Sequence, residues 1–140
     1  MRKFLILFFT ISNLSFSQNM LIPMDGNQQN HLKAYGLAYF ILDNKLDVDW
    51  LLNYRGGSFM FPFLEEIEKE CIYRGISYEK ISSEEVNIIL NQIASPQNNY
   101  DIVKLEKAPK IAVYSPKNKQ PWDDAVTLVL NYSEIKYDVI

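Results

Sequence analysis

An amphipathic helix pattern between two strand patterns constrains the fold of this chain more than any other feature. Apolar residues recur every three to four positions from 32 to 42, which predicts a helix of about four turns. Residues 20–24 form an apolar run before it, and residues 46–52 alternate apolar and polar side chains after it. Alternation with a period of two is typical of a half-buried strand. The sequence therefore predicts a strand–helix–strand unit over 20–52.

The same order of patterns continues along the chain. Pro62 suits the first turn of a helix that stops at Gly75, and a capping box at Ser82 and Glu85 begins another helix. Strand patterns at 76–81 and 111–114 each precede a helix pattern. Strands that alternate with helices favour parallel pairing. We therefore expect the α/β class, as a three-layer sandwich with a mostly parallel sheet and helices on both faces.

Residues 1–17 match the order of a secretory signal peptide. Arg2 and Lys3 precede the apolar run 4–9, and a more polar stretch follows as far as Ser17. The run is too short to cross a bilayer stably. We expect cleavage after Ser17, export to the periplasm or secretion, and no stable membrane span afterwards. A retained membrane anchor and a buried N-terminal strand are the alternatives.

The mature chain divides at a polar stretch that begins near Pro96. We expect an α/β domain over 18–95, a linker over 96–109 with a short strand at 100–105, and a strand–helix–strand unit over 110–140. The last strand pattern ends at Ile140 with no neighbour to follow it. We therefore expect truncation at the C-terminus, with residues 110–140 packing onto the earlier sheet as the alternative.

Charge and residue counts argue against several classes of function. Fourteen Lys and Arg residues stand against 17 Asp and Glu, for a net charge of −3, so nucleic acid is not expected as a partner. One cysteine and one histidine give no metal-ligand spacing, and no cofactor is predicted. Cys71 is either a nucleophile or a buried apolar residue, and its spacing from Ile67 favours burial. His31 has no nucleophile beside it in the sequence, which favours a solvated histidine over a general base.

The best candidate site is the turn after the second predicted strand. Three loops, 25–30, 53–58 and 115–120, would lie at the carboxyl ends of parallel strands, where ligands collect in open α/β sheets. Within 53–58 a guanidinium, backbone donors and a hydroxyl lie close together, and the predicted ligand-binding residues are Asn53, Arg55, Gly56, Gly57 and Ser58. They suit a small anionic or amide ligand. The alternative is that the glycines only make the turn and Arg55 pairs with a surface acid.

Three stretches carry a resemblance to a known family: "HLKAYG", "WLLNYRGGSF" and "SPKNKQPWDDAVTLVL". They resemble the N-terminal part of an exported protein family of Bacteroidetes that is commonly labelled asparagine synthetase B, and the resemblance covers nearly all of the mature chain. Residues 110–140 are also similar to the first strand–helix–strand unit of class I glutamine amidotransferase-like folds.

The resemblance implies glutamine-hydrolysing asparagine synthesis in a protein of several hundred residues. In amidotransferase-like folds the nucleophilic cysteine comes on a later elbow, so no catalytic residue is assigned in this chain and the missing C-terminal part is an expected partner. An asparagine synthetase that hydrolyses glutamine has a cysteine directly after the initiator Met, where this chain has Arg2.

Two hypotheses of function follow. The first is an exported asparagine synthetase B-like, glutamine amidotransferase-like protein of which this chain is the N-terminal part. The second is a non-catalytic envelope module that binds a ligand in the crevice at the strand carboxyl ends. An elbow cysteine followed by His-x-Glu downstream would favour the enzyme.

Overall fold

The computed structural model describes residues 18–114 and 124–140. The elements in chain order are β1 (Gln18–Ile22), α1 (His31–Asp43), β2 (Val48–Leu52), the 3-10 helix η1 (Tyr54–Gly56), β3 (Ser58–Pro62), α2 (Glu65–Arg74), β4 (Glu79–Ser82), α3 (Ser83–Ile93), β5 (Asp101–Leu105), β6 (Ala112–Val113), α4 (Asp124–Ser133) and β7 (Asp138–Val139). The predicted signal peptide, 1–17, lies outside the described residues. Among those described, no helix has the length and apolar content needed to span a membrane.

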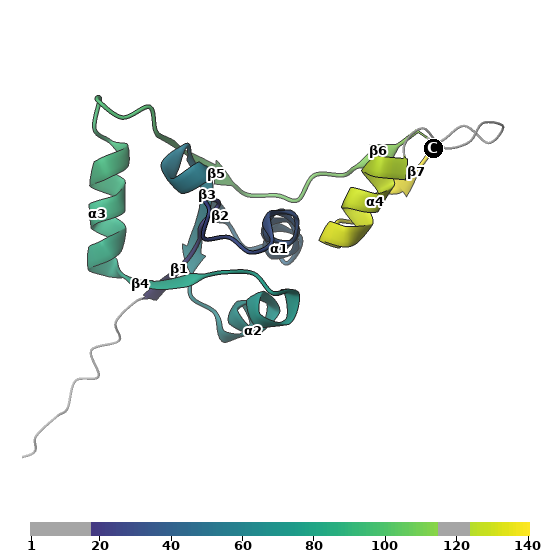
Figure 1. Cartoon of the computed structure of the whole chain (residues 1–140), viewed down its shortest axis with the longest axis horizontal. Coiled ribbons are helices and arrows are strands. Elements are labelled where there is room, and N and C mark those ends of the chain that lie inside the picture. Colours follow the sequence, from purple (N-terminus) through teal and green to yellow (C-terminus); the bar gives the residue numbers. More distant parts are fainter. Residues whose placement is uncertain (1–17, 115–123) are drawn as a thin grey trace, which may run out of the picture.

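Five strands form one antiparallel sheet in the order β4-β1-β3-β2-β5 (Figure 1). Each neighbouring pair is antiparallel, with Leu21 opposite Met60 and Trp50 opposite Val103. The prediction of a three-layer sandwich with a mostly parallel sheet is therefore wrong. The cause is β3, which follows the turn after β2, forms a hairpin with it, and lies between β2 and β1. Pro62, predicted to open a helix, is the last residue of this strand.

The order of the strands gives two interleaved split strand–helix–strand units. β1 and β2 are both antiparallel to β3, so they run in the same direction with β3 between them. β3 and β4 are likewise both antiparallel to β1. This is the ferredoxin-like arrangement, to which β5 adds a strand along β2. Residues 101–105 of the predicted linker 96–109 therefore belong to the main sheet.

Helices cover both faces of the sheet. Figure 1 shows α3 on one side and α1 with α2 on the other. The larger core, under α1 and α2, includes Leu37, Ile41, Phe59 and Cys71. A smaller core under α3 holds Leu21, Leu51, Met60, Ile81, Ile89 and Ile93. Strand β3 contributes to both cores, which explains why its residues 58–61 are all buried.

Local signals in the sequence explain where the helices begin and end. Asn30 caps α1 by accepting a hydrogen bond from the backbone N–H of Lys33 at 3.1 Å. The predicted capping box of α3 is confirmed, because Ser82 and Glu85 accept hydrogen bonds from each other's backbone N–H groups. Gly75 ends α2 with φ of 66°, a conformation that glycine adopts without steric cost.

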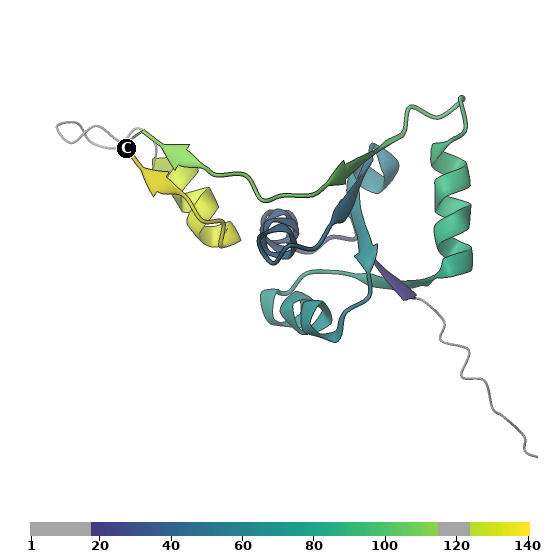
Figure 2. The ribbon, with the colours of Figure 1, turned by 180° about the vertical axis from the view of Figure 1, so that it is seen from behind.

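A second, smaller unit follows the sheet and consists of β6, α4 and β7. Its two strands pair in parallel, Ala112 with Asp138 and Val113 with Val139. Both views place α4 beside α1, on the side of the molecule away from α3 (Figures 1 and 2). A Cβ atom on Gly36 of α1 would lie 1.8 Å from the carbonyl oxygen of Ser133. Only glycine at this position lets the end of α4 approach α1 so closely.

Candidate functional site

The predicted turn 53–58 lies against the loop that follows β1. Arg55 Nε lies 2.7 Å from Asp25 Oδ2, and its two Nη atoms lie 2.8 and 2.9 Å from the carboxylate oxygens of Glu79. The guanidinium of Arg55 is therefore already paired with two carboxylates. The hydrogen bond from Arg55 lowers the pKa of Asp25 below its ordinary value, and the hydrogen bonds to Glu79 raise the pKa of Arg55.

The other residues of the predicted site also contact the protein itself. Asn53 donates to the carbonyl of Asn99 at 2.8 Å, and the Ser58 hydroxyl donates to the carbonyl of Arg55 at 3.2 Å. A Cβ atom on Gly56 would lie 2.3 Å from the Met24 carbonyl oxygen. The ligand role of this turn stays a prediction, and an anionic ligand there would have to displace Asp25 and Glu79 from Arg55.

The predicted crevice at the carboxyl ends of parallel strands needs correction. Antiparallel neighbours place their carboxyl ends at opposite edges, so the sheet has no edge at which all such loops gather. The loops 25–30 and 53–58 still meet, because β1 and β2 run in the same direction on either side of β3. The third predicted loop, 115–120, lies outside the described residues.

Cys71 lies in the larger core, and His31 contacts a backbone carbonyl. The prediction that Cys71 is buried is confirmed, since none of its surface is exposed. Burial raises the pKa of its thiol to about 12, which keeps it protonated and unreactive. His31 Nε2 lies 3.2 Å from the carbonyl oxygen of Met24. No three His, Cys, Asp or Glu side chains among residues 18–114 and 124–140 are grouped to hold a metal ion.

Ion pairs and a hydrogen bond hold the smaller unit against α1 and α2. Glu134 pairs with Lys33 and lies 2.8 Å from Nη1 of Arg74, whose side chain is only 7% exposed. The Tyr132 hydroxyl accepts a hydrogen bond from Asn30 at 2.7 Å. Glu134 adopts φ of 59°, a left-handed conformation that is strained for a residue with a Cβ atom. Its two cationic partners stabilise it there, and they lower its pKa.

Two adjoining cavities lie between the main sheet domain and the smaller unit, and we call them together the inter-unit cleft. They share the lining residues Tyr39, Lys107, Pro109 and Ile111. The first cavity has a volume of about 300 Å³ and the second about 320 Å³. Both lie at the lower end of the range for small-molecule sites.

The second cavity has an aromatic wall. Trp50 and Phe59 stack with ring centroids 6.3 Å apart, and Tyr35 meets Phe59 edge to face at 5.7 Å. The Trp50 indole N–H donates to the carbonyl of Gly57 at 3.0 Å, which fixes the ring. The rest of the lining is mostly apolar and comes partly from the smaller unit, through Ile135.

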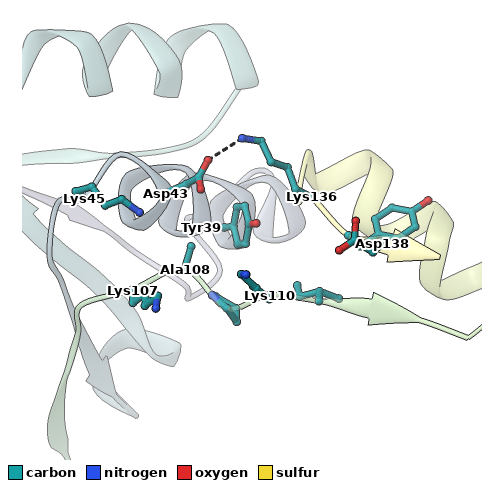
Figure 3. A pocket seen from close by; sticks show the side chains of 11 residues that line it. Tyr39, Asp43, Lys45, Lys107, Ala108, Lys110, Lys136 and Asp138 are labelled. Carbon is teal, nitrogen blue, oxygen red and sulfur yellow. Dashed lines mark hydrogen bonds and ion pairs between the residues drawn. The ribbon is translucent and has the colours of Figure 1, made fainter. Parts of the chain in front are cut away.

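The first cavity is rich in lysine (Figure 3). In that view Tyr39 lies between Lys110 and the ion pair of Asp43 with Lys136. This pair, with Asp43 Oδ2 2.8 Å from Lys136 Nζ, joins α1 to the segment before β7. The charged residues that line this cavity are Lys45, Lys107, Lys110, Lys136, Asp43 and Asp138. Four positive charges against two negative ones make the cavity cationic in a chain whose net charge is −3.

Sequence reasoning missed this cleft because its residues come from five separate parts of the chain: 35–45, Trp50, Phe59, 105–111 and 135–138. Lys107 and Lys110 fall in the predicted linker and at the start of the predicted second unit. The one available signal was the spacing of Lys104, Lys107 and Lys110 at intervals of three in a segment without a helix pattern. A comparison with protein-family models, curated proteins and solved structures found no match for this chain.

Proposed function

We propose that this protein is a non-catalytic, exported module that binds a small molecule in the inter-unit cleft. The observation that carries the proposal is the juxtaposition of a fixed aromatic wall and a lysine-rich cavity at one boundary between two units. Boundaries between structural units are common places for ligand sites. The site differs from the turn 53–58, whose Arg55 already pairs with two carboxylates.

Trp50 gives a direct test, because it lies in the cleft wall. The chain has two tryptophans, so a Trp122→Phe background leaves Trp50 as the only one. We expect the neutral aromatic probe N-phenyl-1-naphthylamine to quench Trp50 emission and to saturate. Tyr35→Ala should weaken this binding about two- to tenfold, since an aromatic contact contributes roughly 0.5–1.5 kcal/mol.

Tyr73→Ala is the matched control, because Tyr73 is 84% exposed on α2 and lies outside the cleft. It should leave probe binding unchanged. Trp50 emission that does not respond to the probe, or equal weakening by the two tyrosine variants, would overturn the proposal.

A second candidate function is the glutamine chemistry that the family resemblance implies. It is favoured by one observation, the parallel pairing of β6 and β7 across α4, which is how an amidotransferase-like unit would begin. In this candidate the catalytic residues belong to chain beyond Ile140. Expression of the downstream reading frame together with this chain, followed by a glutaminase assay, tests it: ammonia release that depends on a downstream cysteine would support it, and none would refute it.

A further inference from the structure

We propose that the inter-unit cleft selects small molecules that carry an anionic group, a carboxylate or a phosphate, on a planar aromatic body. This inference rests on the proposed function and names the ligand class for the same site. It comes from the chemistry of the two cavities and from the way they adjoin.

The anionic group would be bound by Lys107 and Lys110. Both side chains are exposed on the segment between β5 and β6, and within the part of the chain that the structure describes neither takes part in an ion pair. Lys136, by contrast, is held by Asp43 at 2.8 Å. Two exposed lysines that line a cavity and have no ion-pair partner among the described residues gain a charge-assisted contact when an anion binds.

The aromatic body would lie against Tyr35 and Trp50, which pack on the buried ring of Phe59. These rings present a wall that is already ordered by stacking and by the hydrogen bond from Trp50 to Gly57. An ordered wall costs little conformational entropy on binding. The indole N–H is already used, so the wall favours apolar contact over hydrogen bonding.

Tyr39 lines both cavities and therefore joins the two halves of the site. A ligand against the aromatic wall would extend past Tyr39 toward Lys110, which Figure 3 places beside that ring. Cavities of about 300 Å³ accommodate a molecule of one or two fused rings with a charged substituent. A ligand with both groups would therefore contact the aromatic wall and the lysines at the same time, whereas a neutral ring would contact only the wall and a bare anion only the lysines.

Two probes of nearly equal shape test the charge preference in the intact protein. 1-Anilinonaphthalene-8-sulfonate carries an anionic group, and N-phenyl-1-naphthylamine is its neutral counterpart. At low salt we expect the sulfonate to bind roughly three- to tenfold more tightly, as two exposed lysine contacts would give. The advantage should shrink as ionic strength rises.

The double variant Lys107→Gln/Lys110→Gln should bring the affinity ratio of the two probes close to one, because it weakens binding of the sulfonate. An unchanged circular dichroism spectrum and urea midpoint show that the variant is folded. Lys69→Gln/Lys80→Gln removes the same charge from α2 and β4, outside the cleft, and should preserve the ratio. Asp138→Asn, which removes a negative charge from the first cavity, should raise the sulfonate's affinity.

Natural forms of the anion are compared by competition. 1-Naphthyl phosphate and 1-naphthylacetate should displace the sulfonate probe, in an order that identifies phosphate or carboxylate as the preferred group, and 1-naphthol should displace it poorly. A ratio that survives the Lys107→Gln/Lys110→Gln variant, or a preference for the neutral probe, would overturn the inference and leave the proposed function standing. Failure of both probes to bind would refute the proposed function itself.

Discussion

Substitution of Gly36 tests how the smaller unit is attached to the main domain. Alanine in a helix interior is normally favourable over glycine by about 0.5–1 kcal/mol, so in isolation α1 would be stabilised. A Cβ atom on Gly36 would however lie 1.8 Å from the Ser133 oxygen, and Ser133 would have to retreat by roughly 1.5 Å to reach ordinary contact. Overpacking of this kind costs about 1–3 kcal/mol. The preference of the helix for alanine is the same whether α4 is docked or not, so docking of α4 should be weakened by about 1–3 kcal/mol.

Hydrogen exchange resolves where this free energy is lost. The Ile135 amide donates to the Leu130 carbonyl at 2.9 Å in the last turn of α4, so it reports on the smaller unit. In Gly36→Ala this amide should exchange about tenfold faster, while amides of α1 keep their protection. Gly26→Ala is the control, since a Cβ atom there meets nothing within 4 Å. Unchanged protection of Ile135 together with a more stable α1 would show that the close approach does not hold α4 in place.

Three further predictions concern the main domain. Arg55→Gln should lower the free energy of unfolding at pH 7. Because Arg55 lowers the pKa of Asp25 in the folded state, the stability that this pair contributes is present above the ordinary pKa of 3.8 and is lost as the pH falls below it. The denaturation profiles of variant and wild type should therefore converge in acid. Cys71, with a pKa raised to about 12 by burial, should react with dithionitrobenzoate at pH 8 at least about 100-fold more slowly in the native protein than in denaturant. Ser82→Ala removes half of the capping box of α3 and should cost about 1 kcal/mol by urea denaturation.

The sequence predicted local structure well where a single period or cap decides it. The helix expected from 32 to 42 is found at His31–Asp43, and the capping box at Ser82 is present. In these places the signal depends on residues within one or two turns. Tertiary packing does not have to be known to interpret it.

The arrangement of the sheet was predicted wrongly because one strand was missed. Residues 59–61 form a short apolar run between Ser58, which follows two glycines, and Pro62. A short run of this kind cannot be assigned to a strand or a helix by its period. Its side chains are buried on both faces of the sheet, which removes the alternation that would mark an edge or half-exposed strand. When β3 is left out, the sequence shows a simple alternation of strands and helices, and that alternation predicts parallel pairing.

The position of β3 also explains why the expected site and the inter-unit cleft differ. The hairpin brings Trp50 of β2 and Phe59 of β3 side by side on the sheet face that α1 covers, so the aromatic wall exists only because β3 pairs with β2. No spacing within the sequence indicates the cavity beside this wall, because two of its other lining residues, Tyr35 and Ile135, lie 100 residues apart.

The width of the inter-unit cleft depends on the contacts that hold the smaller unit against α1 and α2. One wall belongs to α1 and the sheet, and the other to residues near Ile135. The close approach of Gly36 to Ser133 fixes the distance between these walls. So do the ion pairs of Glu134 with Lys33 and Arg74. Binding in the cleft and docking of α4 should therefore be linked, because a ligand that contacts both walls favours the docked state. Gly36→Ala should then weaken binding of an aromatic anion without unfolding the main domain, and a saturating ligand should restore protection to the Ile135 amide in that variant. Ligand affinity that is insensitive to Gly36→Ala would mean that the main domain alone provides the site.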